Sequence, residues 1–131
     1  MRRFTIYVCA AAVLIITCAQ RMKAEGLHAV RPLAGYACMM LNLTDTQMRD
    51  NSLVVPVYAG PSTTSGRVGN ASAIVIAKSP LHIVNGFAEM LFPNGATVWI
   101  DAKMLRPYHS ESNPTAHCTP SLMSNGKPGL G

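Results

Sequence analysis

The chain has 131 residues, and its 11 Lys and Arg residues against 6 Asp and Glu residues give a formal net charge of +5. Four of the basic residues and none of the acidic ones lie in the first 24 residues, which leaves 7 basic residues against 6 acidic ones in the remainder. This near-neutral remainder has no basic cluster, which excludes nucleic acid as the main partner. Its length of about 107 residues excludes a second domain.

Residues 1–24 have the pattern of a secretion signal. Two arginines precede an apolar run from Phe4 to Ala19, which is shorter than the roughly 20 apolar residues of a membrane span. Small residues favour cleavage after Ala24, and an earlier cut after Ala19 is the alternative. An uncleaved anchor and a lipid-modified Cys18 are two further alternatives. Cleavage near Ala24 predicts a periplasmic or secreted protein without a stable membrane span.

The two cysteines that remain after cleavage are Cys38 and Cys118. In an oxidising compartment such thiols tend to pair, so one disulfide is the simplest expectation. It would tie the C-terminal segment to the start of the domain. Two free thiols are the alternative, because Cys118 lies in a segment whose composition is typical of disorder.

Residues 25–35 contain Pro and Gly without a sustained period and are interpreted as a leader. An apolar run over 36–43 follows, and Thr44 and Gln47 then have the spacing of a capping box, which predicts a short helical turn. Asn85-Gly86 is the signal of a tight hairpin turn. Strands are expected over residues 53–58, 71–77, 81–84, 87–92, 97–100 and 104–105.

Short strands separated by turn signals predict an all-β fold, a small barrel or sandwich, with the helical turn as an N-terminal elaboration. The predicted domain covers residues 36–109. Residues 110–131 are rich in Ser, Asn, Pro, Thr and Gly, and such a composition buries too little apolar surface to offset its ordering entropy. We therefore expect a disordered tail.

Several stretches between Val55 and Tyr108 have the order and spacing of a known module. They are Val57-Tyr58-Ala59-Gly60-Pro61-Ser62-Thr63-Thr64-Ser65, Val68-Gly69, Asn85-Gly86-Phe87-Ala88-Glu89-Met90 and Pro93-Asn94-Gly95-Ala96-Thr97-Val98-Trp99-Ile100. Together they resemble the bacterial SH3 domain, a five-stranded barrel common in exported bacterial proteins. Phe87 stands where the family often has Trp, and Val98 stands where Gly usually precedes the Trp. The resemblance therefore carries over the fold but no groove specificity.

Barrels of this type recognise extended peptides through aromatic residues and adjacent loops. The residues expected to bind a ligand are Tyr58, Trp99 and Tyr108, with residues 61–65 as a rim that includes Pro61 and Ser62. The alternative is that Trp99, and also Tyr58, belong to the core. The predicted function is that of an exported binding module for a peptidoglycan peptide or a periplasmic or extracellular protein. The alternative is a structural or accessory protein without a free ligand site.

Catalysis, metal binding and a cofactor are not expected. His117 and Cys118 are a Cys–His pair of the kind used by wall hydrolases, but a predicted disordered tail gives a thiolate neither a fixed environment nor a positioned base. The spacing of His109, His117 and Cys118 matches no compact zinc pattern. The carboxylates are scattered along the chain, so no general acid pair can be assigned.

Overall fold

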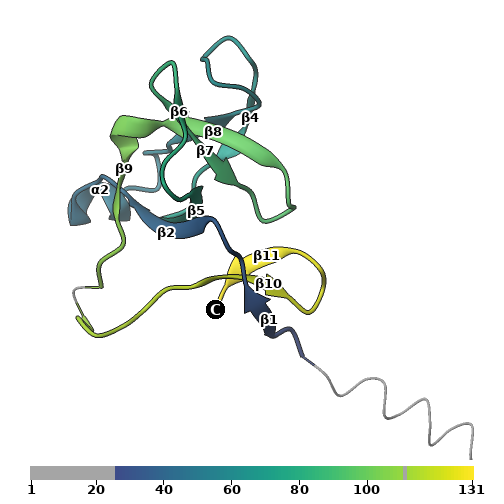
Figure 1. The fold of residues 1–131 in the computed structure, drawn as a ribbon. Helices are drawn as coiled ribbons and strands as arrows, with labels where there is room; N and C mark the ends of the chain where they lie inside the picture. Colours follow the sequence, from purple (N-terminus) through teal and green to yellow (C-terminus); the bar gives the residue numbers. More distant parts are fainter. Residues whose placement is uncertain (1–25, 111) are drawn as a thin grey trace, which may run out of the picture.

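A computed structural model describes residues 26–110 and 112–131 of the chain, which is mostly β-structure (Figure 1). The predicted signal, its cleavage after Ala24 and the alternatives at Ala19 and Cys18 lie outside the described residues. The helical elements are α2 (Asp45–Arg49) and the 3-10 helix η1 (Ala102–Met104). The strands are β1 (Ala29–Pro32), β2 (Tyr36–Leu41), β3 (Pro56–Tyr58), β4 (Arg67–Asn70), β5 (Ile74–Lys78), β6 (Ile83–Val84), β7 (Phe87–Leu91), β8 (Thr97–Asp101), β9 (Leu105–Pro107), β10 (Pro120–Met123) and β11 (Pro128–Leu130).

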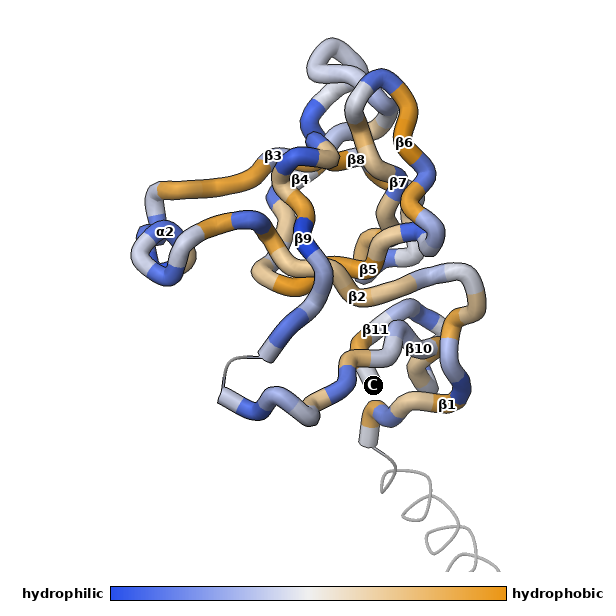
Figure 2. The backbone as a smooth tube through the Cα atoms, turned by 60° about the vertical axis from the view of Figure 1, so that its left-hand side comes forward, coloured by the Kyte–Doolittle hydropathy of each residue, from blue (hydrophilic) through white to orange (hydrophobic). Residues whose placement is uncertain are grey.

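Eight strands form one antiparallel sheet in the order β4-β3-β8-β7-β5-β2-β9, with β6 paired to β7 beside this path. The sheet curls around an apolar interior (Figure 2). The prediction of an all-β fold is confirmed. The prediction of a five-stranded barrel is not, because the described strands number eight in this sheet and no pairing joins its end strands β4 and β9 into a closed barrel.

The core is built from alternate residues of neighbouring strands. In β7 and β8 the register sets Ala88 opposite Ile100 and Met90 opposite Val98, and all four side chains are buried. Val57 on β3 joins them, and both Val57 and Ile100 are completely enclosed. Because successive strand residues point to opposite faces, this buried set turns their sequence neighbours outward.

The helical turn and the hairpin predicted from local sequence are confirmed. The Thr44 hydroxyl accepts a hydrogen bond from the Gln47 amide at 3.2 Å, and the Thr44 amide donates one to the Gln47 side chain at 2.9 Å. This is the reciprocal capping box that fixes the start of α2. Asn85 and Gly86 both have positive φ, at 52° and 80°, as the two-residue turn between β6 and β7 requires.

The two ends of the described chain differ from the sequence prediction. The predicted leader contains β1, and the predicted disordered tail contains β10 and β11. These three strands form a second antiparallel sheet in the order β1-β10-β11. Composition alone suggested disorder because these strands bury little, with Pro120 and Ser121 their only buried residues. The order comes from backbone pairing between segments far apart in sequence and from a disulfide. Composition indicates neither of them.

The predicted disulfide between Cys38 and Cys118 is present, with the two Cα atoms 6.0 Å apart. It connects β2 of the large sheet to the segment that leads into β10. Cys38 is buried on the side of β2 opposite to Met39 and Leu41, which pack in the core. The disulfide therefore fastens the three-stranded sheet to the outside of the large one.

The buried position of Ile100 gives a prediction for stability. Truncation by Ile100→Ala leaves a cavity in a completely enclosed site and should lower the free energy of unfolding by about 2–5 kcal/mol. The same truncation at Ile83, which is 51% exposed, is the matched control and should cost about 0.5 kcal/mol. Urea unfolding followed by tryptophan fluorescence measures both, and equal losses would contradict the assigned core.

The disulfide gives a second prediction. It joins residues 80 apart in sequence, so the double variant Cys38→Ala/Cys118→Ala should unfold with about 4 kcal/mol less free energy in the chain-entropy account of cross-links. Urea unfolding of the oxidised protein and of the variant measures this difference. Adding a reductant to the variant is the control and should change nothing. An identical unfolding midpoint for oxidised and reduced wild-type protein would contradict the prediction.

Candidate functional site

The outer surface of β3 and β8 carries two of the three aromatic side chains that were predicted to bind a ligand. Tyr58 on β3 lies directly opposite Trp99 on β8, and both are half-buried. They face outward because Val57, Val98 and Ile100 beside them in sequence face the core. The structure thus brings together the two aromatic residues on which the sequence prediction depended.

Two further rings extend this pair. Phe87 packs edge-on against Tyr58 with ring centroids 5.8 Å apart, and His82 lies tilted against Trp99 at 5.7 Å. We call the surface formed by Tyr58, His82, Phe87 and Trp99 the aromatic face. Offset and edge-to-face packing of this kind fixes the rings relative to one another. The rings of the aromatic face are therefore in place before any ligand binds, and each ring offers a polarisable surface for contact.

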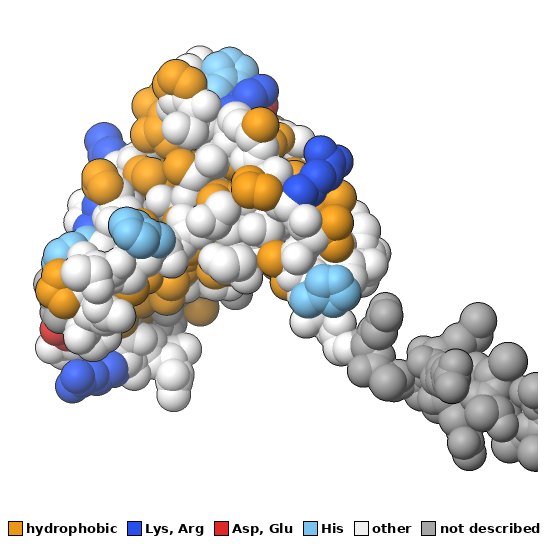
Figure 3. Space-filling view, turned by 60° about the horizontal axis from the view of Figure 1, so that its bottom comes forward, with side chains coloured by type: hydrophobic (Ala, Val, Ile, Leu, Met, Phe, Trp, Pro, Cys, Tyr) orange, Lys and Arg blue, Asp and Glu red, His pale blue; other side chains and the backbone are white. Residues whose placement is uncertain are grey.

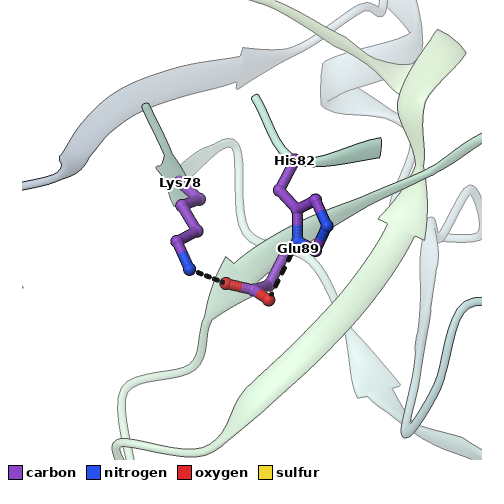
Figure 4. A network of polar contacts seen from close by, with 3 residues as sticks. All are labelled: Lys78, His82 and Glu89. Atoms are coloured by element: carbon purple, nitrogen blue, oxygen red, sulfur yellow. Dashed lines mark hydrogen bonds and ion pairs between the residues drawn. The ribbon is translucent and has the colours of Figure 1, made fainter. Parts of the chain in front are cut away.

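Lys78, His82 and Glu89 form a network of polar contacts (Figure 4), which adjoins the aromatic face through the packing of His82 on Trp99. The Lys78 ammonium lies 3.2 Å from one carboxylate oxygen of Glu89, and Nδ1 of His82 lies 3.3 Å from the other. Glu89 is opposite Trp99 in the β7–β8 register, so the network and the aromatic face are continuous. The Glu89 side chain is only 15% exposed, whereas Lys78 and His82 are about half exposed. Lys78 and His82 are therefore the members of this network that a ligand can reach.

The neighbours of Glu89 decide its charge. Partial burial raises the pKa of the Glu89 carboxyl, but hydrogen bonds and charges from Lys78 and His82 outweigh this, and the pKa lies below its ordinary value of 4.5. Glu89 is therefore ionised at neutral pH and holds Lys78 and His82 beside Trp99.

The other predicted residues fall in two places. Pro61 and Ser62 are half-buried in the loop between β3 and β4, three and four residues after Tyr58. The Ser65 hydroxyl holds this loop by donating to the Ser62 carbonyl at 2.7 Å and accepting from the Gly60 amide at 3.0 Å. Tyr108 instead follows β9, at the far end of the strand order from β3 and β8. The structure groups Pro61 and Ser62 with Tyr58 but does not group Tyr108 with them.

Sequence reasoning did not select four members of this surface: Lys78, His82, Phe87 and Glu89. The alternation of Phe87-Ala88-Glu89-Met90 carried a usable signal, because it places Phe87 and Glu89 on one face and the two buried residues on the other. Lys78 and His82 had no such signal. They reach Glu89 through the pairing of β5 with β7 and the fold-back of the chain before β6.

A hollow of about 260 Å³ lies beside Tyr58. It is bounded by the chain that leads into β3, by the β3–β4 loop and by the end of β8. Its walls include Leu53, Val54, Phe87 and Asp101. We call it the Tyr58 hollow. It opens next to the aromatic face, because Tyr58 and Phe87 belong to both.

The pair His117 and Cys118, which was considered for catalysis, does not include a free thiol. Cys118 is disulfide-bonded to Cys38 and is therefore not a free thiol beside His117. Among residues 26–110 and 112–131, no three His, Cys, Asp or Glu side chains gather in a group that could hold a metal ion. In the same residues, no helix has the length and apolar character needed to cross a membrane. Lys and Arg side chains on the face seen from below are scattered among apolar ones (Figure 3).

Comparison with known proteins finds no match to the chain among family models, curated proteins or solved structures. Function is therefore inferred from the geometry of the aromatic face and the residues around it.

The Glu89 network predicts a pH dependence of stability. The folded pKa of Glu89 is depressed, so its ionised form stabilises the protein above the unfolded pKa, and this stabilisation is lost as the pH falls below about 5 through the folded pKa. The variant Glu89→Gln should therefore lose less of its free energy of unfolding than the wild type as the pH falls from 7 to 3. Urea unfolding of wild type and variant between pH 7 and pH 3 measures it. A stability difference that stays constant over this range would contradict the assigned ion pairs.

Proposed function

We propose that this protein is an exported, non-catalytic binding module that recognises a cell-wall peptide or a periplasmic protein partner. The observation that carries the proposal is the pairing of Tyr58 with Trp99 on the outer surface of the sheet, where both rings remain partly open to solvent. Paired aromatic side chains offer a large contact area at a low cost in conformational entropy. The half-exposed Lys78 and His82 add hydrogen-bond donors beside them.

We assign the fold of residues 55–108 to an SH3-like barrel. The resemblance of the Val57–Ser65 and Pro93–Ile100 stretches to bacterial SH3 domains supports this assignment. The antiparallel order β4-β3-β8-β7-β5, curled around one core, is compatible with such a barrel that stays open between its end strands. In this assignment β2, α2 and the three-stranded sheet are additions to the barrel, and β9 joins the sheet through β2.

The proposed location is the periplasm or the extracellular medium. The Cys38–Cys118 disulfide supports an oxidising compartment, where such bonds form and persist. The secretion pattern of residues 1–24 supports the same location.

Extended peptides are the expected ligands, because a groove lined by aromatic residues on a small barrel suits a chain without secondary structure of its own.

A structural or accessory role is the second candidate. It is favoured by the packing of Phe87 on Tyr58 and of His82 on Trp99, which covers part of both rings. In that role the four rings serve to stiffen the sheet and bind no ligand. The two candidates differ in whether the isolated protein retains a wall peptide or a protein partner.

Co-sedimentation with purified peptidoglycan sacculi, together with a pull-down from periplasmic extract, tests the proposal. The mature protein should be retained in one of the two assays. Trp99→Leu keeps an apolar side chain but removes the ring, and it should lower the retained fraction roughly tenfold, as removal of an aromatic hot spot does. Lys78→Ala should lower the retained fraction as well.

Lys127→Ala is the matched control for Lys78→Ala, because Lys127 is an exposed lysine in the turn between β10 and β11. It should leave retention unchanged. Thermal unfolding of each variant checks that the fold is kept. If wild-type protein is retained by neither the sacculi nor any extract protein, the binding role is wrong and the accessory role stands.

A further inference from the structure

The Tyr58 hollow combines apolar walls with a single charged side chain. Leu53 and Val54 form its rim and are 41% and 48% exposed, so the hollow is open to a ligand. Phe87 and Met104 contribute further apolar surface. The only Asp, Glu, Lys or Arg among the lining residues is Asp101. Such a hollow favours a ligand group that is apolar along its length and charged at one end.

Asp101 has no cationic partner among the described residues. Both ion pairs among the described residues are formed by Glu89. One oxygen of the Asp101 carboxylate accepts a hydrogen bond from the Lys103 amide at 3.0 Å, which caps the 3-10 helix η1 and fixes the side chain. The carboxylate is thus held at the hollow with acceptor capacity to spare, because an ionised carboxylate can accept several hydrogen bonds.

The rim of the hollow is held in place before any ligand arrives. The Asp50 carboxylate accepts hydrogen bonds from the amide and the hydroxyl of Ser52, at 3.0 and 2.7 Å. The Leu53 amide then donates to the Asp50 carbonyl at 3.1 Å. These bonds order the turn that presents Leu53 and Val54. A preformed rim lowers the entropy cost of binding.

We propose that the Tyr58 hollow binds a basic side chain, lysine or arginine, of a partner polypeptide. Charge complementarity supports this occupant, because a group that displaces water from the hollow must leave the Asp101 carboxylate paired. The aliphatic stem of a basic side chain packs along Leu53 and Val54 while its head reaches Asp101. The ring of Tyr58 can add a cation–π contact.

The inference rests on the proposed function, since it assigns the chemical class of the ligand group that docks beside the aromatic face. A volume of about 260 Å³ accommodates one long side chain and not a folded segment. The remainder of the polypeptide would then lie across Tyr58 toward Trp99, which are adjacent on β3 and β8.

Titration of the isotopically labelled mature protein with two short capped peptides tests this site by NMR. The first peptide is Ala-Ala-Lys-Ala-Ala, and the second replaces the lysine with norleucine, which keeps the stem and lacks the charge. The lysine peptide should shift the amide signals of residues 53–55, 57–58 and 101–104. The norleucine peptide should bind roughly tenfold more weakly, the loss expected for one charge-assisted contact.

Asp101→Asn keeps the shape of the side chain and the acceptor for the Lys103 amide, and it should weaken the lysine peptide by the same factor. Asp45→Asn makes the same charge change on α2, outside the hollow, and should leave the affinity unchanged. Equal binding of the two peptides, or no shifts at residues 53–55, 57–58 and 101–104, would overturn the inference. Retention on sacculi without lysine-peptide binding would overturn it while leaving the proposed function intact.

Discussion

The register of β7 against β8 is the constraint on which the rest of the structure depends. Burial of Ala88 opposite Ile100 and of Met90 opposite Val98 fixes that register, because a slip by one residue would turn the two buried side chains of the shifted strand to solvent. The same register sets Glu89 opposite Trp99 and Phe87 opposite Asp101 on the outer surface. The buried residues of the core therefore determine which side chains are neighbours on the outer surface. The arrangement of the candidate site is thus set by core residues that are not part of the site.

The three-stranded sheet shows a different source of order. Its strands β1, β10 and β11 bury almost nothing, and three such short strands are marginal without a core. Pairing of β10 with β1 and the Cys38–Cys118 disulfide bring it against the large sheet. An apolar hollow of about 240 Å³ between β11 and the outer side of β5 and β7 indicates incomplete packing at this junction. Covalent and backbone bonds, more than apolar burial, keep the second sheet in place.

Local features were predictable from the sequence, and long-range ones were not. The capping box at Thr44 and the turn at Asn85-Gly86 each depend on a few neighbouring residues, and the structure contains both. The order of the C-terminal segment depends on β1, about 90 residues earlier in the chain, and no local pattern reports such a pairing. The Lys78–Glu89–His82 network lies within residues 78–89, but it depends on the pairing of β5 with β7 and of β6 with β7, which the local pattern did not show.

The two carboxylates on the outer surface of the site, Glu89 and Asp101, have different electrostatic roles. Glu89 is largely enclosed and already neutralised by Lys78 and His82, so it orders donors beside Trp99 but attracts no further cation. Asp101 is exposed and, among the described residues, has only the Lys103 amide as a partner, so its charge remains available at the Tyr58 hollow. A ligand that lies across the surface from Trp99 to Phe87 thus contacts the hydrogen-bond donors of Lys78 and His82 at one end. At the other end it contacts an acceptor, the Asp101 carboxylate. Such a polarity favours one direction of a bound peptide, with carbonyl or carboxylate groups near Lys78 and a basic group near Asp101.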